Sequence, residues 1–132
     1  MSEKTQLNYI LKSTDSLFDE SHKERLFNQI EVHKYFINRN LPFIITWEEA
    51  AFSWLENVYL PLHYVINQWE VRHAFNGLSP AELFFRISDH WFYLLKEDEE
   101  TSALYAAIDY ASRYGKGLGR FIASLQIPKK VA

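Results

Sequence analysis

The chain has no cysteine among its 132 residues. It therefore has no disulfide framework and no thiolate metal site, and such a composition is typical of a reducing compartment. The longest uncharged run, residues 57–69, is shorter than a membrane span. The first residues carry no apolar signal-peptide core behind a basic flank. We therefore expect a cytoplasmic protein without a membrane partner.

Motifs of several enzyme classes are missing as well. There is no Gly-x-Ser-x-Gly elbow and no His-Glu-x-x-His zinc motif. Residues 115–119 (GKGLG) resemble a phosphate loop, but no predicted strand precedes them and no Ser or Thr follows the Gly-Lys pair. We interpret them as a helix end and a bend. The sequence gives no support for nucleophilic catalysis or for a cofactor.

Composition and charge point to a globular domain. Hydrophobic residues make up 48% and charged residues 23% of the chain, as in ordinary folded domains. The net charge of −3 disfavours nucleic acid as a partner. No acid follows Asp109, however, and the cations of that last stretch are Arg113, Lys116, Arg120, Lys129 and Lys130. This basic segment keeps weak nucleic-acid binding open as a third interpretation.

The clearest structural signal is the start of a helix over residues 79–97. Ser79 is a good N-cap, Pro80 occupies the first helical position, and Glu82 completes a capping box. Apolar residues then recur on more than one face of this segment. We expect a helix that is covered on several sides.

Similar signals predict the other helices. Residues 5–12 form a short helix, and residues 21–38 form a longer one with Ser21 as its N-cap. Thr46 opens a third helix with a capping box, and Pro61 is expected to break or kink it near residues 59–60 before a segment that runs to about residue 75. Residues 43–45, between these helices, are expected to form a buried linker.

Towards the C-terminus, the acidic residues 97–100 are expected in the first turn of a helix that ends at Gly115 in a left-handed conformation. A last short helix then docks through its large apolar side chains. Those side chains are Phe121, Ile122 and Leu125.

The chain also repeats itself. Residues 25–37 align with residues 82–94 at a constant offset of 57, as in 90 − 33 for His33 and His90. Farther along, Trp54 aligns with Tyr110 at an offset of 56. The sequence therefore predicts an all-α, single-domain bundle over residues 1–132, built from two helix-loop-helix pseudo-repeats at about 21–60 and 78–115, with 1–20 and 116–132 peripheral.

Two stretches resemble a known family. Residues 33–58 (HKYFINRNLPFIITWEEAAFSWLENV) and 78–97 (LSPAELFFRISDHWFYLLKE) are similar to motifs of an uncharacterised bacterial domain found C-terminal to a lipopolysaccharide-kinase-like region. The family pattern is L-x-P-A-E-x-F, then H-x-W-Y-L-x-E, then E-E-A and V-L. Asn38 and Arg39 stand where the family has Ser-Glu. The resemblance implies an α-helical domain and supplies no catalytic residue.

The aligned histidines are the candidate chemical site. A pseudo-twofold arrangement brings His33 and His90 together, with Glu31, Asp89 or Asp109 as the neighbouring carboxylate, in a metal or acid/base site. The plainer interpretation is a pair of core histidines that pack and bond to neighbouring groups. We favour the plainer interpretation because no metal-ligand spacing accompanies either histidine.

Aromatic residues make up 17% of the chain, more than a small core readily buries. The sequence therefore favours a non-catalytic cytoplasmic interaction or regulatory module that binds itself or another protein. The candidate interaction residues are Trp47, Trp69, Arg113, Lys116 and Arg120. The alternative is a metal-binding or small-ligand-binding helical protein, conceivably an enzyme, centred on His33 and His90.

Overall fold

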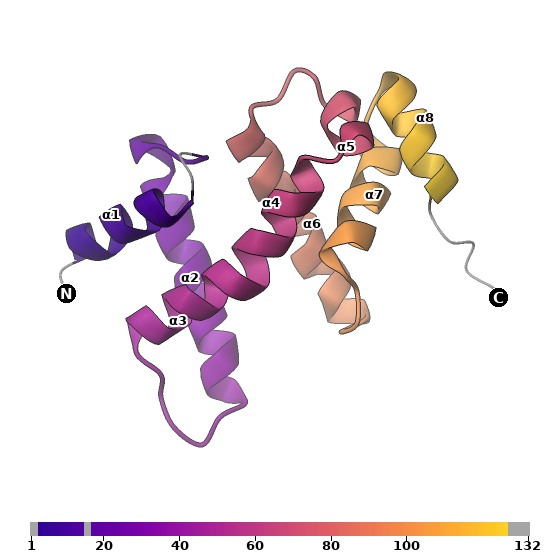
Figure 1. Cartoon of the computed structure of the whole chain (residues 1–132). Coiled ribbons are helices and arrows are strands. Elements are labelled where there is room, and N and C mark those ends of the chain that lie inside the picture. Colours follow the sequence, from indigo (N-terminus) through magenta and orange to yellow (C-terminus); the bar gives the residue numbers. More distant parts are fainter. Residues whose placement is uncertain (1–2, 15–16, 127–132) are drawn as a thin grey trace. The chain divides into compact units, whose positions relative to one another are not determined.

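A computed structural model describes residues 3–14 and 17–126 of the chain (Figure 1). Within these ranges every regular element is helical, which confirms the all-α prediction. The elements in chain order are α1 (Glu3–Ser13), η1 (Glu20–His22), α2 (Lys23–Arg39), α3 (Trp47–Trp54), η2 (Leu55–Tyr59), α4 (Leu60–Ile66), α5 (Trp69–Ala74), α6 (Pro80–Glu97), α7 (Ala103–Tyr114) and α8 (Gly117–Gln126). No helix in the described ranges is long and apolar enough to span a membrane.

The chain divides into two compact units, Met1–Tyr59 (unit 1) and Leu60–Ala132 (unit 2). The boundary lies just before Pro61, the proline that was expected to interrupt the helix. Each unit contains one of the two predicted pseudo-repeats, so the domain expected over residues 1–132 has two separately packed halves. Lys129 and Lys130, part of the predicted basic segment, lie outside the described residues.

Unit 1 is built on the pairing of α2 with α3, and α1 packs against α2. Its core consists of fully buried apolar side chains from several helices. These include Ile10, Leu26, Ile30, Ala50 and Trp54. The helix over residues 5–12 is confirmed as α1.

The start of α2 differs from the prediction. Asp19, and not Ser21, is the capping residue, and it caps the short helix η1 that leads into α2. The Asp19 side chain accepts a hydrogen bond from the Ser21 amide, and the His22 ring accepts one from the Asp19 amide. Hydrogen bonds that the Asp19 carboxylate accepts from the Ser21 hydroxyl and from the Ser21 amide lower the pKa of this carboxyl. The helical turns begin at Glu20, two residues before the predicted start. Asp19 is therefore the residue whose side chain can accept hydrogen bonds from the first amides that lack a partner within the helix.

The predicted distortion before Pro61 is present, but the helix does not break. Residues Leu55–Tyr59 form a π-helical turn between α3 and α4. Proline has no N–H and its ring crowds the preceding turn, and a wider turn relieves both problems. The segment after Pro61 is then split into α4 and α5, which ends at Ala74 as the prediction of about residue 75 required.

The linker between α2 and α3 is not buried as expected. Phe43 is 60% and Ile44 82% exposed, and only Ile45 of the three is buried. The Asn38 side-chain oxygen accepts a hydrogen bond from the Ile45 amide at 2.9 Å. That bond holds the end of the loop against α2 while the two preceding side chains face outwards.

The predicted N-cap of helix α6 is confirmed, since the Ser79 hydroxyl accepts a hydrogen bond from the Glu82 amide at 3.2 Å and Pro80 follows as the first helical residue. Its first half contributes buried residues to the core of unit 2, among them Leu83, Phe84 and Ile87. Its second half is half-buried or exposed. The expectation of a helix covered on several sides therefore holds for the first half alone.

The acidic residues 97–100 lie at the end of α6 and in the loop before α7, and not in the first turn of α7, so that prediction is wrong. Ser102 caps α7 by accepting a hydrogen bond from the Tyr105 amide at 3.0 Å. The Asp98 carboxylate accepts one from the Glu100 amide within the loop. Because the Ser102 hydroxyl already accepts a hydrogen bond from an amide of the first turn, acidic side chains are not needed there to stabilise the start of α7.

Helix α8 docks mainly through small residues, and of the three predicted large ones only Ile122 is half-buried. Gly119 and Ala123 are buried, whereas Phe121 is 58% and Leu125 67% exposed. A Cβ atom at Gly119 would lie 2.6 Å from the His73 carbonyl carbon, so α8 approaches the backbone of α5 directly. The left-handed residue is Gly117, with φ 67°, whereas Gly115 is extended, contrary to the prediction.

Candidate functional site

His33 lies on α2 in unit 1, half-buried, and forms a hydrogen bond to Ser53 of α3. Its Nε2 atom is 2.9 Å from the Ser53 hydroxyl oxygen. The Asn57 amide group donates to the same hydroxyl at 3.1 Å. Burial lowers the pKa of His33 because the charged form loses hydration inside the protein. The ring is therefore a neutral packing element joined to α3.

His90 lies on α6 in unit 2 and belongs to a charged cluster. Its Nε2 atom donates to the Asp109 carboxylate at 2.8 Å, and the Arg113 Nε atom lies 3.0 Å from both oxygens of that carboxylate. The Asp109 side chain is 4% exposed, whereas the Arg113 side chain is 63% exposed. Hydrogen bonding and the charge of Asp109 raise the pKa of Arg113. The cluster joins α6 to α7 and neutralises a buried carboxylate.

The two histidines occupy the same place in the predicted repeat. Ser53 and Asp109 are separated by 109 − 53 = 56 positions, the offset at which Trp54 aligns with Tyr110. Each histidine therefore uses Nε2 to bond the aligned position of the following helix. This correspondence supports the internal repeat, which stays a prediction.

The predicted five-residue site combines residues of both units. His33 and His90 belong to different units, and each already bonds a residue of its own unit. Of the three carboxylates, Asp109 meets His90, whereas Glu31 and Asp89 are exposed. Nowhere in residues 3–14 and 17–126 does a group of three or more His, Cys, Asp or Glu stand where it would hold a metal ion. The geometry supports the packing interpretation of both histidines.

A cavity of about 920 Å³ opens beside the cluster, and we call it the acidic cavity. Glu97, Asp98 and Glu100 line it from the end of α6 and the loop that follows, together with His90 and Arg113. The Trp91 indole N–H donates to the Thr101 carbonyl at 2.8 Å and fixes this loop against α6. The negative lining favours cations, but the described residues form no multidentate ligand set there.

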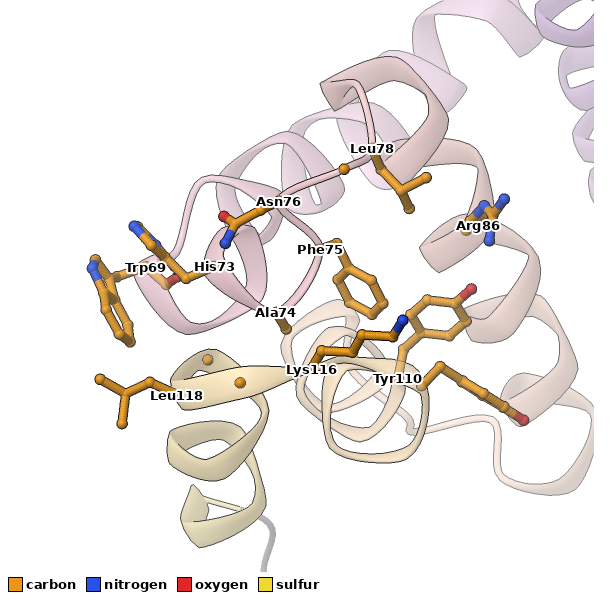
Figure 2. A pocket seen from close by; sticks show the side chains of 14 residues that line it. Trp69, His73, Ala74, Phe75, Asn76, Leu78, Arg86, Tyr110, Lys116 and Leu118 are labelled. Atoms are coloured by element: carbon orange, nitrogen blue, oxygen red, sulfur yellow. The ribbon is translucent and has the colours of Figure 1, made fainter.

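A second cavity of unit 2, about 760 Å³, has the opposite charge, and we call it the cationic cavity (Figure 2). It is lined by residues of α5, the turn that follows it, α6, α7 and the start of α8. Arg86 and Lys116 are its cations, and none of its lining residues is Asp or Glu. Sequence reasoning named Lys116 and Trp69 but not the cavity, because α5, α6 and α8 build it from residues far apart in the chain.

The five candidate interaction residues lie in different environments. Trp47 is 8% exposed and stacks on Phe27 with ring centroids 6.1 Å apart, so it belongs to the core of unit 1. Trp69 is 47% exposed and stacks on His73 at 4.3 Å. The remaining three are cations on the surface of unit 2.

Two of those cations are already engaged. Arg113 binds Asp109, and the Arg120 Nε atom donates to the Ser112 carbonyl at 3.0 Å. No ion pair of the Lys116 ammonium is formed within the described residues. Lys116 is therefore the cation of this set that is available to a ligand.

An apolar surface in unit 1 was missed by sequence reasoning. We call it the hairpin-tip patch, and its residues are Tyr35, Phe36, Leu41, Phe43 and Ile44. All five are at least 37% exposed. Part of the signal was present in the sequence as the apolar run of residues 41–45 between Asn40, the C-cap of α2, and Thr46, the N-cap of α3, but its exposure depends on how α2 and α3 pack.

No family model, curated protein or solved structure matches this chain. The resemblance to the bacterial domain found beside a kinase-like region stays a prediction. The surfaces and cavities themselves are therefore the basis for assigning a function.

Proposed function

We propose that the protein is a non-catalytic helical interaction module of the cytoplasm that self-associates through the hairpin-tip patch. The observation that carries the proposal is the exposure of Ile44, at 82%, and Phe43, at 60%, in a patch of five large apolar side chains. Exposed apolar patches larger than a few hundred Å² are rare on monomers and mark interaction sites.

The loop that carries Phe43 and Ile44 is held in place at its end. Asn38 anchors the Ile45 amide, and Thr46 and Glu49 form a capping box with bonds of 3.0 and 3.1 Å. A loop fixed in this way loses little conformational entropy on binding. Its apolar side chains are thus presented to a partner and not merely left over from folding.

Charge at the edge of the patch supports a second copy of the chain as the partner. The Arg39 guanidinium lies 5.8 Å from the ring centroids of both Tyr35 and Phe36, and Glu48 is exposed at the start of α3. In a two-fold interface each residue meets its complement in the other copy, so a patch with both signs at its rim can pair with itself. An anionic lipid surface would be repelled by the acids Glu48 and Glu49.

Sedimentation of the purified chain tests this proposal. We expect a dimer at micromolar concentration, and the double variant Phe43→Ser/Ile44→Ser should be monomeric with an unchanged circular dichroism spectrum. Leu125→Ser is the matched control, since Leu125 is 67% exposed on α8 of unit 2. This control should leave the dimer intact.

Charge reversal makes the test more specific. Arg39→Glu and Glu48→Lys should each weaken the dimer, and the double variant should recover at least part of the loss if the two residues face each other across a two-fold axis. A wild-type chain that sediments as a monomer at about 100 μM, a concentration at which even weak specific dimers form, contradicts self-association.

A further inference from the structure

The cationic cavity of unit 2 is a formed site that the proposed self-association does not use. Its volume of about 760 Å³ lies within the range of about 300–1,000 Å³ typical of small-molecule sites. All its lining residues belong to unit 2, from α5 to the start of α8. The cavity is therefore defined without reference to unit 1.

Aromatic rings form the inner wall of this cavity. The Phe75 and Tyr110 ring centroids are 5.3 Å apart, and those of Tyr110 and Tyr114 are 4.9 Å apart. Tyr114 is 59% exposed, so one end of the row of rings is open to a ligand. A planar ring is the chemical group that best complements such a wall.

Both ionised groups of the cavity are cations. Figure 2 shows the Lys116 side chain extending towards Tyr110, with Phe75 beside it and Arg86 on α6. The Arg86 Nε atom lies 3.6 Å from a Glu82 oxygen, a long ion pair that leaves the rest of the guanidinium available. Lys116 has no carboxylate partner among the described residues. The cavity therefore presents positive charge beside an aromatic wall.

The backbone around Lys116 is held by a hydrogen bond between helices, which fixes the point from which its side chain extends. The Lys116 amide donates to the Ala74 carbonyl at 3.0 Å, which joins the start of α8 to the end of α5. Gly117 follows in the left-handed region at φ 67°, a conformation that turns the chain directly after Lys116. His73 completes the rim by donating from Nδ1 to the Trp69 carbonyl at 2.8 Å.

We propose that the cationic cavity binds a small organic anion that carries an aromatic ring and a carboxylate or phosphate group. The ring stacks along Tyr110 and Tyr114, and the anionic group pairs with the Lys116 ammonium and the Arg86 guanidinium. The acidic cavity, which shares Tyr114 as a lining residue, repels the same ligand because Glu97, Asp98 and Glu100 line it. The sign of the lining charge thus directs the anion to one of the two cavities.

Three naphthalene derivatives test the proposal on the full chain by isothermal titration calorimetry. 2-Naphthoate and 2-naphthyl phosphate carry the two anionic groups, and 2-naphthamide has the same ring without charge. We expect both anions to bind at least about tenfold more tightly than the amide, the factor that one charge-assisted hydrogen bond contributes. The stronger of the two anions identifies carboxylate or phosphate as the preferred group.

Variants locate the binding. Lys116→Gln and Arg86→Gln should each weaken binding of the preferred anion by about tenfold and leave the amide unaffected. Lys96→Gln is the matched control, since Lys96 lies over the Phe92 ring and outside the cavity. That control should bind like the wild type, and the melting temperature of all three variants should be close to that of the wild type, because these side chains are exposed.

Three results would overturn the proposal. They are equal affinity for the amide and the anions, unchanged anion affinity in both cavity variants, and no saturable binding of either anion at millimolar concentration. None of them bears on self-association, which depends on unit 1 residues and is measured by sedimentation.

Discussion

Asp109 is the one charged side chain that is buried among the described residues. A carboxylate in the protein interior loses its hydration, and Arg113 and His90 replace it with charge and hydrogen bonds. Ser53, at the aligned position of unit 1, needs no such neutralisation because its hydroxyl is uncharged. His33 therefore sits beside a neutral group in unit 1, whereas His90 sits beside an anion in unit 2.

The burial of His33 predicts that the free energy of unfolding depends on pH. Burial lowers its pKa below the ordinary value of 6.5, so the unfolded chain binds the proton more readily than the folded protein does. The contribution of His33 to the free energy of unfolding is therefore fully present above about pH 6.5 and is lost as the pH falls through the lower folded-state pKa. His33→Gln does not titrate, so its disadvantage relative to the wild type should shrink between pH 8 and pH 5 in urea denaturation.

If wild type and His33→Gln differ in the free energy of unfolding by the same amount at every pH, proton binding to His33 is not linked to folding.

At the scale of elements, glycine decides how α8 packs. A Cβ atom at Gly119 would lie 2.6 Å from the His73 carbonyl carbon and 2.7 Å from the Glu70 carbonyl oxygen, and one at Gly115 would lie 2.6 Å from the Ala74 Cβ. These atoms belong to the backbone or to the short side chain of α5 and cannot move aside cheaply. The GKGLG stretch is thus a contact surface between helices and not a phosphate loop.

We expect Gly119→Ala to destabilise the protein by ~2 kcal/mol, because the strain of overpacking outweighs the better helix propensity of alanine. Gly115→Ala should have a similar effect. Gly77→Ala is the control, since a Cβ atom added at Gly77 would have nothing within 4 Å and the backbone there is not left-handed. Chemical denaturation measures all three, and equal stability of Gly119→Ala and Gly77→Ala would mean that α8 is not held closely to α5.

Several helix boundaries were predictable because capping acts over only three or four residues. Thr46 and Ser79 cap α3 and α6 as the sequence predicts, and Pro61 distorts the helix just before it. The buried face of a helix depends instead on its neighbours. Phe121 was expected to be inside and Gly119 was assigned to a bend, since hydrophobicity alone favours the larger side chain.

At the scale of the whole molecule, the charge distribution argues against nucleic acid. The net charge is −3, and the described cations near the C-terminus are partly engaged, Arg113 with Asp109 and Arg120 with the Ser112 carbonyl. We expect no saturable binding of a labelled DNA duplex at physiological salt in fluorescence anisotropy. Tight binding that weakens steeply with salt would instead indicate several phosphate contacts and revive the third interpretation.

The sequence by itself determined the helical class, several helix starts and the aligned positions of His33 and His90. These properties follow from hydrophobic period and capping, which act within a few residues. Only the tertiary structure decided the partners of the two histidines, the exposure of Phe43 and Ile44, and the cationic cavity. The reason is that each depends on contacts between helices: His90 meets Asp109 from 19 positions away, and the Lys116 amide reaches the Ala74 carbonyl at the end of α5, 116 − 74 = 42 positions earlier in the chain.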